Sequence, residues 1–198
     1  EHLSHYNGFE QYANSKMNII RHQTKEDYFI CPSTLNCDDY YDFSHVLPTI
    51  MKVSPYGSDF RRILMSAEHN ERFCGTHNKY NLAVAVAIAK CLDVNDDIIC
   101  NAVKNFKGLE HRLEPVGEYQ GIKFYNDVLA TIPVATQCAI DALNDVDTLI
   151  IGGMDRGIGY DSFEDFIIRS TVKNIIGLPD TGTFICNNIA GKTSEKNI

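Results

Sequence analysis

The chain has 198 residues, of which 44% are hydrophobic and 22% charged, so it can bury a core as one or two domains of ordinary globular composition. Its formal net charge of −8 supplies no basic field and argues against non-specific binding to nucleic acid. No apolar run approaches the roughly 20 residues that span a bilayer, and the sequence contains no signal-peptide pattern.

The cysteine pattern indicates free thiols. The total of seven is odd, and no Cys-x-x-Cys pair occurs, which disfavours both a disulfide framework and a zinc site. A reducing cytoplasm is the expected location. The cysteines are Cys31, Cys37, Cys74, Cys91, Cys100, Cys138 and Cys186.

The first third of the chain alternates between one helix and short strand-like pieces. Apolar residues recur near a 3.6-residue period over 9–21, which predicts a helix. A short strand over 28–31 ends at Pro32. Between 33 and 75, strand-like pieces at 45–53 and 60–66 lie among turn-forming residues, and we expect them to be antiparallel.

Two helices follow. Thr76 to Asn78 can cap a helix that runs through 81–92, and this segment is apolar nearly all round, so we expect it to be buried. A second helix over 94–106 has one apolar face and ends at Gly108.

Strands and helices alternate in the last third. A strand over 122–125 precedes a helix that begins at Pro133, and strands over 148–151 and 174–178 flank a helix over 162–170. This alternation predicts an α/β domain with a parallel, doubly wound sheet.

The rhythm changes at about residue 110, so we expect one domain over 1–110 and a second over 111–198. In doubly wound sheets, ligands bind beyond the carboxyl ends of the strands. Asn126-Asp127 and Gly153-Met-Asp-Arg156 both fall at such ends, which predicts a site there.

The segment from Gly108 to Glu114 places a His-Arg pair between two glutamates on a connection, where binding residues are often found. Arginine suits phosphate recognition, although Arg112 alone is better read as part of a surface ion pair on a linker. Gly191-Lys-Thr193 lacks the rest of a phosphate-loop motif and is read as a surface turn.

Five motifs occur in an order and spacing that together are highly specific. They are His2 followed by Lys16, Gly75-Thr-His-Asn78 with Asn81, Gly108-Leu-Glu-His-Arg-Leu-Glu114, Tyr125-Asn-Asp127, and Gly152-Gly-Met-Asp-Arg-Gly157. With these motifs the chain resembles the Mur ligases, the ATP-dependent amino-acid ligases of peptidoglycan precursor synthesis. Within that family it is most similar to the glutamate-adding member.

The resemblance implies a partial architecture. The chain would comprise the end of the family's central ATPase domain, followed by part of the Rossmann-like, doubly wound C-terminal domain. The phosphate loop and the UDP-sugar domain would lie upstream, and we expect the 198 residues alone not to turn over.

The resemblance also implies a reaction in two steps. ATP phosphorylates the carboxylate of UDP-MurNAc-L-Ala, and the amine of glutamate then attacks the acyl phosphate. Such a reaction needs cations around the transferred phosphoryl group and a set of oxygen ligands for Mg²⁺.

Residues in the first half match metal-binding and adenine-binding positions of the family. His2 matches a magnesium ligand, and Lys16 matches a lysine whose carbamate would help to bind the metal. Without the resemblance these would be a terminal histidine and a helix-surface lysine. Asn78 and Asn81 match positions that contact adenine. An amide suits this contact because it can both donate and accept hydrogen bonds. The alternative role of the two residues is helix capping.

Residues in the second half match positions for the phosphates, the ribose and the amino acid. Arg112 matches the arginine that reaches the terminal phosphate when the domains close. Asp127 matches the residue that binds the ribose hydroxyls. Thr131 and Arg156 match positions that hold the carboxylates of glutamate. His111 is read as a packed linker residue.

One departure leaves the amino acid open. The family motif Asn-Asp-Ser-Lys-Ala-Thr reads here with Val128 for the serine and Leu129 for the lysine. A subgroup that adds L-glutamate also lacks that lysine. The alternatives are therefore an L-glutamate-adding enzyme or another Mur-superfamily ligase. A third is a non-catalytic nucleotide-binding module.

Overall fold

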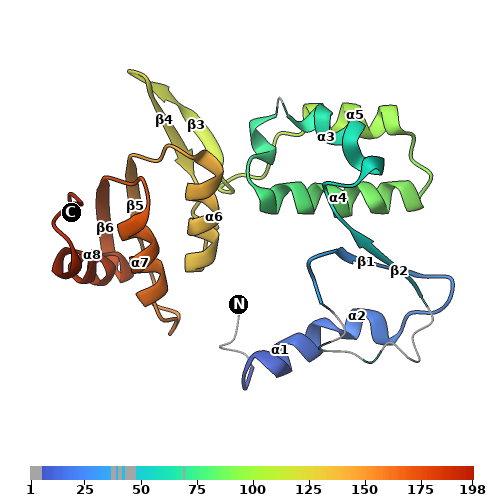
Figure 1. The fold of residues 1–198 in the computed structure, drawn as a ribbon, viewed down its shortest axis with the longest axis horizontal. Helices are drawn as coiled ribbons and strands as arrows, with labels where there is room; N and C mark the ends of the chain where they lie inside the picture. The colour runs from blue at the N-terminus through green and yellow to red at the C-terminus, as the bar shows by residue number, and fades with distance from the viewer. Residues whose placement is uncertain (1–5, 37–38, 40–41, 43–47, 69) are drawn as a thin grey trace. The chain divides into compact units, whose positions relative to one another are not determined.

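The computed structural model describes residues 6–36, 39, 42, 48–68 and 70–198, and the chain divides into two compact units (Figure 1). The first unit covers Glu1–Lys107 and the second covers Gly108–Ile198. Each unit has its own buried apolar cluster. The fold is mixed α/β, as the sequence predicted.

The first unit contains a pair of strands and several helices. Its strands pair in parallel from Tyr28–Thr49 to Pro32–Val53. Its elements are α1 (Phe9–Lys16), α2 (Asn18–Arg21), β1 (Tyr28–Pro32), β2 (Thr49–Val53), η4 (Ser58–Phe60), α3 (Arg61–Ala67), η5 (Glu71–Phe73), α4 (Thr76–Cys91) and α5 (Asp96–Asn105).

Three helices make the main core of this unit. Helix α3 contributes Ile63, α4 contributes Leu82 and Val86, and α5 contributes Ile99 and Val103, all of them buried. The four-residue spacings on α4 and α5 place these side chains on one face of each helix. Helix α4 is thus buried along one face only, and Ile88 on that helix is 46% exposed, so the expectation of an all-round buried helix is wrong.

Two further expectations for this unit are wrong. The piece at 60–66 is helical, because Ile63 and Ala67, four residues apart, bury one helical face. The strands at 28–32 and 49–53 run parallel instead of antiparallel; the connection over 33–48 exceeds the dozen or so residues that a parallel crossover needs. Part of the predicted strand, 45–47, lies outside the described residues.

The second unit contains a hairpin and a parallel strand pair. Figure 1 shows the β3–β4 hairpin apart from β5 and β6. The elements are β3 (Glu114–Tyr119), β4 (Ile122–Asn126), α6 (Pro133–Leu143), β5 (Thr148–Gly153), α7 (Asp161–Arg169), β6 (Asn174–Asp180) and α8 (Thr181–Lys192).

The strand predicted at 122–125 therefore pairs differently from expectation. It forms β4, which pairs antiparallel with β3; among the strands of the second unit, all of them described, only β5 and β6 pair in parallel. Gln120 and Gly121 connect the hairpin strands, and both have positive φ, 51° and 79°. This is the geometry that tight hairpin turns require.

Side chains of α6, α7, β6 and α8 form the core of the second unit. Ile167, Val172 and Ile189 are fully buried, each with 0% exposure, and Ile175 of β6 lies among them. On β5, Leu149 and Ile151 pack against this cluster. The alternation along β5 leaves Ile150 exposed on the other face of the pair.

One carboxylate lies inside this core. Glu164 of α7 is 1% exposed and accepts hydrogen bonds from Asn188 Nδ2 and Lys192 Nζ, each at 2.8 Å. The charge of Glu164 is thus paired and hydrogen-bonded, as a buried carboxylate requires. Gly191-Lys-Thr193, which the sequence predicted to be a surface turn, is instead the last turn of α8 and its C-cap.

Glycines bring α8 close to the strands. A Cβ on Gly182 would collide with the carbonyl oxygen of Ile151, and a Cβ on Gly177 would lie 2.7 Å from Cys186 Sγ. Because the backbones approach this closely, larger residues have no space at either position.

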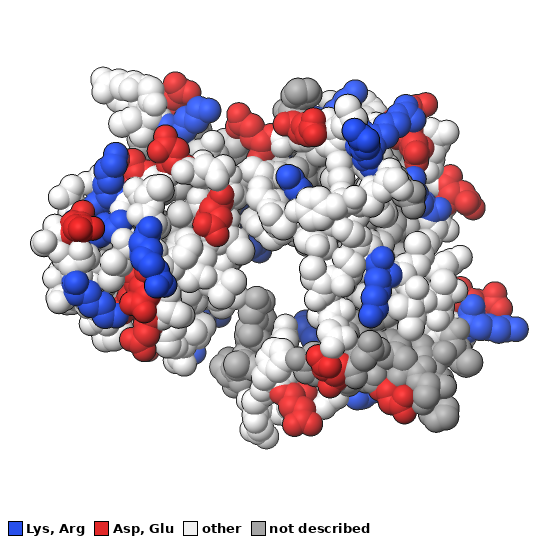
Figure 2. Space-filling model, viewed as in Figure 1, with Lys and Arg blue, Asp and Glu red and all other residues white. Residues whose placement is uncertain are grey.

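Charges of both signs are interspersed over the described part of the face in Figure 2. In the part of the chain that the structure describes, none of the helices is at once long enough and apolar enough to cross a lipid bilayer.

We expect Gly182→Ala to lower the free energy of unfolding by about 1–3 kcal/mol, because its methyl group has to displace main-chain atoms of β5. Gly191→Ala on the same helix is the matched control. Nothing lies within 4 Å of the added Cβ there, so stability should rise by up to about 1 kcal/mol. Urea denaturation measures both; equal effects would contradict the close approach of α8.

Candidate functional site

Two segments of the second unit are joined by hydrogen bonds next to the start and end of the hairpin. Leu113 N donates to Asp127 Oδ1 at 2.8 Å, and Leu129 N donates to the carbonyl oxygen of His111 at 3.2 Å. The side chains of Asn126 and His111 meet at 2.9 Å between Nδ2 and Nδ1. These bonds hold residues 111–113 beside residues 126–129.

The backbone of this loop pair is unusual. His111 and Leu113 have φ values of 63° and 43°, a region that non-glycine residues seldom occupy. Glu114 Oε2 accepts a hydrogen bond from His111 N at 2.8 Å, and Asp127 accepts the bond from Leu113 N. The two carboxylates therefore stabilise the left-handed conformation on either side of Arg112.

This conformation leaves Arg112 available for a ligand. Arg112 is exposed, and its side chain makes no ion pair or hydrogen bond with any described residue. Asp127 is half-buried; Oδ1 accepts the Leu113 bond, while Oδ2 has no partner among the described residues. A guanidinium and a carboxylate oxygen on adjoining segments can respectively bind a phosphate and accept hydrogen bonds from hydroxyl groups.

Thr131 lies in the same loop, between β4 and α6. Ala130 N donates to the carbonyl oxygen of Asp127 at 2.8 Å, which turns the chain directly after the strand. Thr131 is exposed, two residues before α6 begins at Pro133. The preceding side chains, Val128 and Leu129, are 72% and 42% exposed.

Arg156 follows the carboxyl end of β5 and is exposed. Its neighbour Asp155 accepts hydrogen bonds through Oδ1 from Gly157 N at 2.9 Å and from the Tyr160 hydroxyl at 3.3 Å. Burial, followed by the charge of Asp155 and the hydrogen bond to it, raises the pKa of Tyr160. The Tyr160 hydroxyl thus stays protonated and can donate at neutral pH.

The asparagine candidates lie in the first unit. Asn78 Nδ2 donates to the carbonyl oxygens of Cys74 at 3.0 Å and Arg72 at 3.5 Å, so it holds the turn before α4. Its amide hydrogens are therefore engaged, and Oδ1 remains for a ligand. Asn81, three residues later, is exposed.

The metal candidates are only partly described. His2 lies outside the described residues. Lys16 Nζ, in its unmodified ammonium form, lies 5.5 Å from the centroid of the Tyr12 ring, within the range of a cation–π contact. Among the described residues, no group of three His, Cys, Asp or Glu side chains could hold a metal ion together.

The structure thus gathers some candidates and leaves others apart. Arg112, Asp127 and Thr131 lie on hydrogen-bonded or adjoining segments, whereas Arg156 lies on a separate loop of the same unit. The hydrogen bond between the His111 ring and Asn126 was not predicted from the sequence, from which His111 was read as a packed linker residue. The adjacent Asn-Asp pair at a strand end was the signal that could have indicated it.

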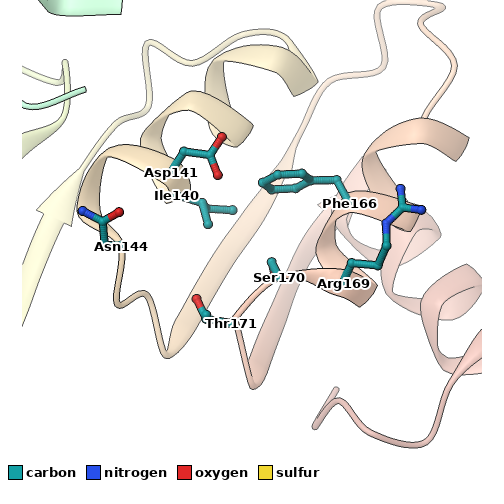
Figure 3. Close-up of a pocket in the computed structure, with 7 residues that line it drawn as sticks. All are labelled: Ile140, Asp141, Asn144, Phe166, Arg169, Ser170 and Thr171. Carbon is teal, nitrogen blue, oxygen red and sulfur yellow. The ribbon is translucent and has the colours of Figure 1, made fainter. Parts of the chain in front are cut away.

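A pocket in the second unit lies away from these residues. It has a volume of about 420 Å³, and Figure 3 shows Asp141 of α6 and Phe166 of α7 pointing toward each other across it. Its lining residues are Ile140, Asp141, Asn144, Phe166, Arg169, Ser170 and Thr171, none of which is a candidate site residue.

Comparison with known proteins confirms the resemblance to the Mur ligases. The chain is 31% identical to the UDP-N-acetylmuramoylalanine--D-glutamate ligase of Listeria monocytogenes serotype 4b over 91% of its length, and 36% identical to that of Lachnoclostridium phytofermentans over 82%. These alignments cover 42% and 39% of the two relatives, so the chain spans less than half of their length. No protein-family model matches the chain.

The fold is also that of a Mur-type ligase. A murein peptide ligase from Psychrobacter arcticus 273-4 superposes with a TM-score of 0.53 over 93% of this chain and 45% of its own length. The two sequences share 17% identity, so this likeness concerns the fold alone.

We expect Asp127→Ala to lower the free energy of unfolding by about 1 kcal/mol, because it leaves the N–H of buried Leu113 without an acceptor. Asp127→Asn is the matched control, since it keeps an oxygen at the Oδ1 position and should leave stability nearly unchanged. Urea denaturation compares the two variants. Equal losses would mean that charge, and not this hydrogen bond, accounts for the effect.

Proposed function

We propose that this chain, a relative of the Mur ligases over most of its length, is part of an ATP-dependent ligase that joins glutamate to UDP-MurNAc-L-Ala. The main support is the identity of 31–36% with D-glutamate ligases over 82–100% of the chain. The loop pair that carries Arg112 and Asp127 supplies side chains suited to a nucleotide.

The nucleotide would be bound by the positively charged Arg112 and the negatively charged Asp127 of the loop pair. Asp127 Oδ2 would accept hydrogen bonds from the ribose hydroxyls, while Oδ1 stays engaged with Leu113 N. Arg112 would bind the terminal phosphate through its planar guanidinium. Asn78 Oδ1 and the amide of Asn81 would contact the adenine from the first unit.

The incoming amino acid would be bound through Arg156 and Thr131. A guanidinium can pair with a carboxylate through two parallel hydrogen bonds, and a threonine hydroxyl can donate one more. Both side chains are exposed. Arg156 follows the carboxyl end of β5, where ligands bind in parallel α/β sheets, and Thr131 lies in the loop after β4 of the antiparallel hairpin.

In this reaction the residues would bind and orient the phosphoryl group and the glutamate. Arg112 would stabilise the charge on the phosphoryl group as it moves to the substrate carboxylate. Arg156 and Thr131 would hold the glutamate so that its amine faces the acyl carbon, which then loses phosphate as the amide forms. A bound Mg²⁺ would supply further positive charge, with His2 and a carbamate of Lys16 as its candidate ligands.

We further propose that the first unit is the end of a central ATP-binding domain and that the second is part of a C-terminal ligase domain. The proposed boundary stays at about residue 110. The proposed place of action is the cytoplasm, and the 198 residues alone are proposed to be inactive.

An L-glutamate-adding ligase is the second candidate. Val128 and Leu129 present exposed apolar side chains where the family motif has serine and lysine. Without that cation, the amino acid would have one ionic contact fewer, and the site would then be less strictly limited to the D configuration at the α-carbon. The stereochemistry therefore has to be measured.

We expect the full-length protein to release phosphate from ATP when supplied with UDP-MurNAc-L-Ala and D-glutamate, and not with either substrate alone. The assay is run in parallel with L-glutamate. Release with only the L form would favour the second candidate. No release with either form would leave a non-catalytic nucleotide-binding module as the better description.

We expect Arg112→Ala to lower turnover by about a hundredfold or more, because it removes a cation from the transferred phosphoryl group. Stability should stay within about 0.5 kcal/mol of wild type, since the side chain is exposed and makes no hydrogen bond or ion pair with the described residues. Arg169→Ala, at the end of α7 and away from the candidate residues, should leave turnover unchanged. Wild-type turnover of Arg112→Ala would exclude this arginine from the site.

A further inference from the structure

The first turn of α8 contacts both ends of the loop that carries Arg156. At the start of the loop, Thr181 Oγ1 donates a hydrogen bond to the carbonyl oxygen of Gly153 at 2.8 Å. At its end, the rings of Tyr160 and Phe184 lie 6.3 Å apart between centroids, tilted by 59°. Thr181 and Phe184 are three residues apart and therefore lie on the same side of α8.

The loop also contains a contact of its own. Asp155 Oδ1 accepts hydrogen bonds from Gly157 N and from the Tyr160 hydroxyl, so the carboxylate next to Arg156 is turned inward. Tyr160 thus connects two partners, because its ring contacts Phe184 and its hydroxyl holds Asp155.

These contacts are important because the two glycines of the loop permit many backbone conformations. Gly153 and Gly157 have φ values of 135° and 67°, which only glycine adopts readily, and nothing lies within 4 Å of a Cβ built at either position. Without contacts to its surroundings, a segment with two such glycines would sample many conformations. The side chains of Thr181 and Tyr160 restrict it.

We propose that Thr181 and Tyr160 are positioning residues that fix the direction of Arg156 and thereby set the affinity for an amino acid with a side-chain carboxylate. Neither residue needs to touch the ligand. The inference rests on the proposed function, because it assumes that Arg156 binds the glutamate.

The position of α8 makes Thr181 suitable for this role. Gly182 packs directly on the backbone of β5, and Lys192 at the other end of the helix is held by buried Glu164. A helix fixed at both ends holds the Thr181 hydroxyl in place. The bond to Gly153 therefore connects the loop to a helix that packs directly on the backbone of β5.

The test compares Thr181→Val with Thr181→Ser in the full-length protein. Valine keeps the shape but removes the donor, so the KM for glutamate should rise about fivefold, the effect of one lost hydrogen bond, while kcat and the KM for ATP stay within about twofold. Serine keeps the hydroxyl and should restore the wild-type KM. Tyr160→Phe keeps the ring contact and should raise the same KM.

Hydrogen exchange gives a second readout that does not depend on activity. Amides of residues 153–160 should exchange faster in Thr181→Val than in Thr181→Ser or wild type, because the start of the loop is released. Equal exchange in all three proteins would overturn the inference.

The kinetic outcomes separate the two proposals. If the wild-type protein turns over and Thr181→Val has the wild-type KM for glutamate, the positioning role is wrong while the proposed function stands. A parallel rise in the KM for ATP would indicate general loosening and would also overturn the role. No turnover of wild type with either glutamate enantiomer would refute the proposed function, and the inference with it.

Discussion

The hydrogen bond between Leu113 N and Asp127 Oδ1 is the interaction on which the candidate site depends. It spans the whole β3–β4 hairpin, so residues 14 positions apart in the sequence lie side by side. The same carboxylate keeps its second oxygen for a ligand, and Arg112 is turned outward between two left-handed residues. One acceptor thus serves both the local backbone and the proposed nucleotide.

The second unit combines this loop pair with a parallel α/β core. Buried apolar side chains of α6, α7 and α8 cover one side of β5 and β6, and the ends of the strands carry the exposed polar residues. The core supplies rigidity while the loops supply the chemistry, which is the usual division in such folds.

The sequence predicted the element types better than their pairing. Helical periods identified α4 and α5, but the short strands at 28–32 and 49–53 carry no sign of direction, which depends on partners far away in the chain. The hairpin could have been found from Gln120-Gly121, because two residues that end in glycine between strand-like segments favour a tight turn. Burial of Glu164 could not have been found, since its partner Lys192 lies 28 residues away.

The glycine contacts of α8 have a mechanical consequence. With Gly182 against the backbone of β5 and Gly177 against α8, the helix and the strands lie so close that no room remains for a methyl group at either position. The packing of α8 on the strands therefore leaves little space for the helix to shift, whereas Gly153 and Gly157 in the loop have open space around them. We therefore expect any adjustment at this edge to come from rotation about a few backbone torsion angles of the loop, while α8 keeps its position on the strands.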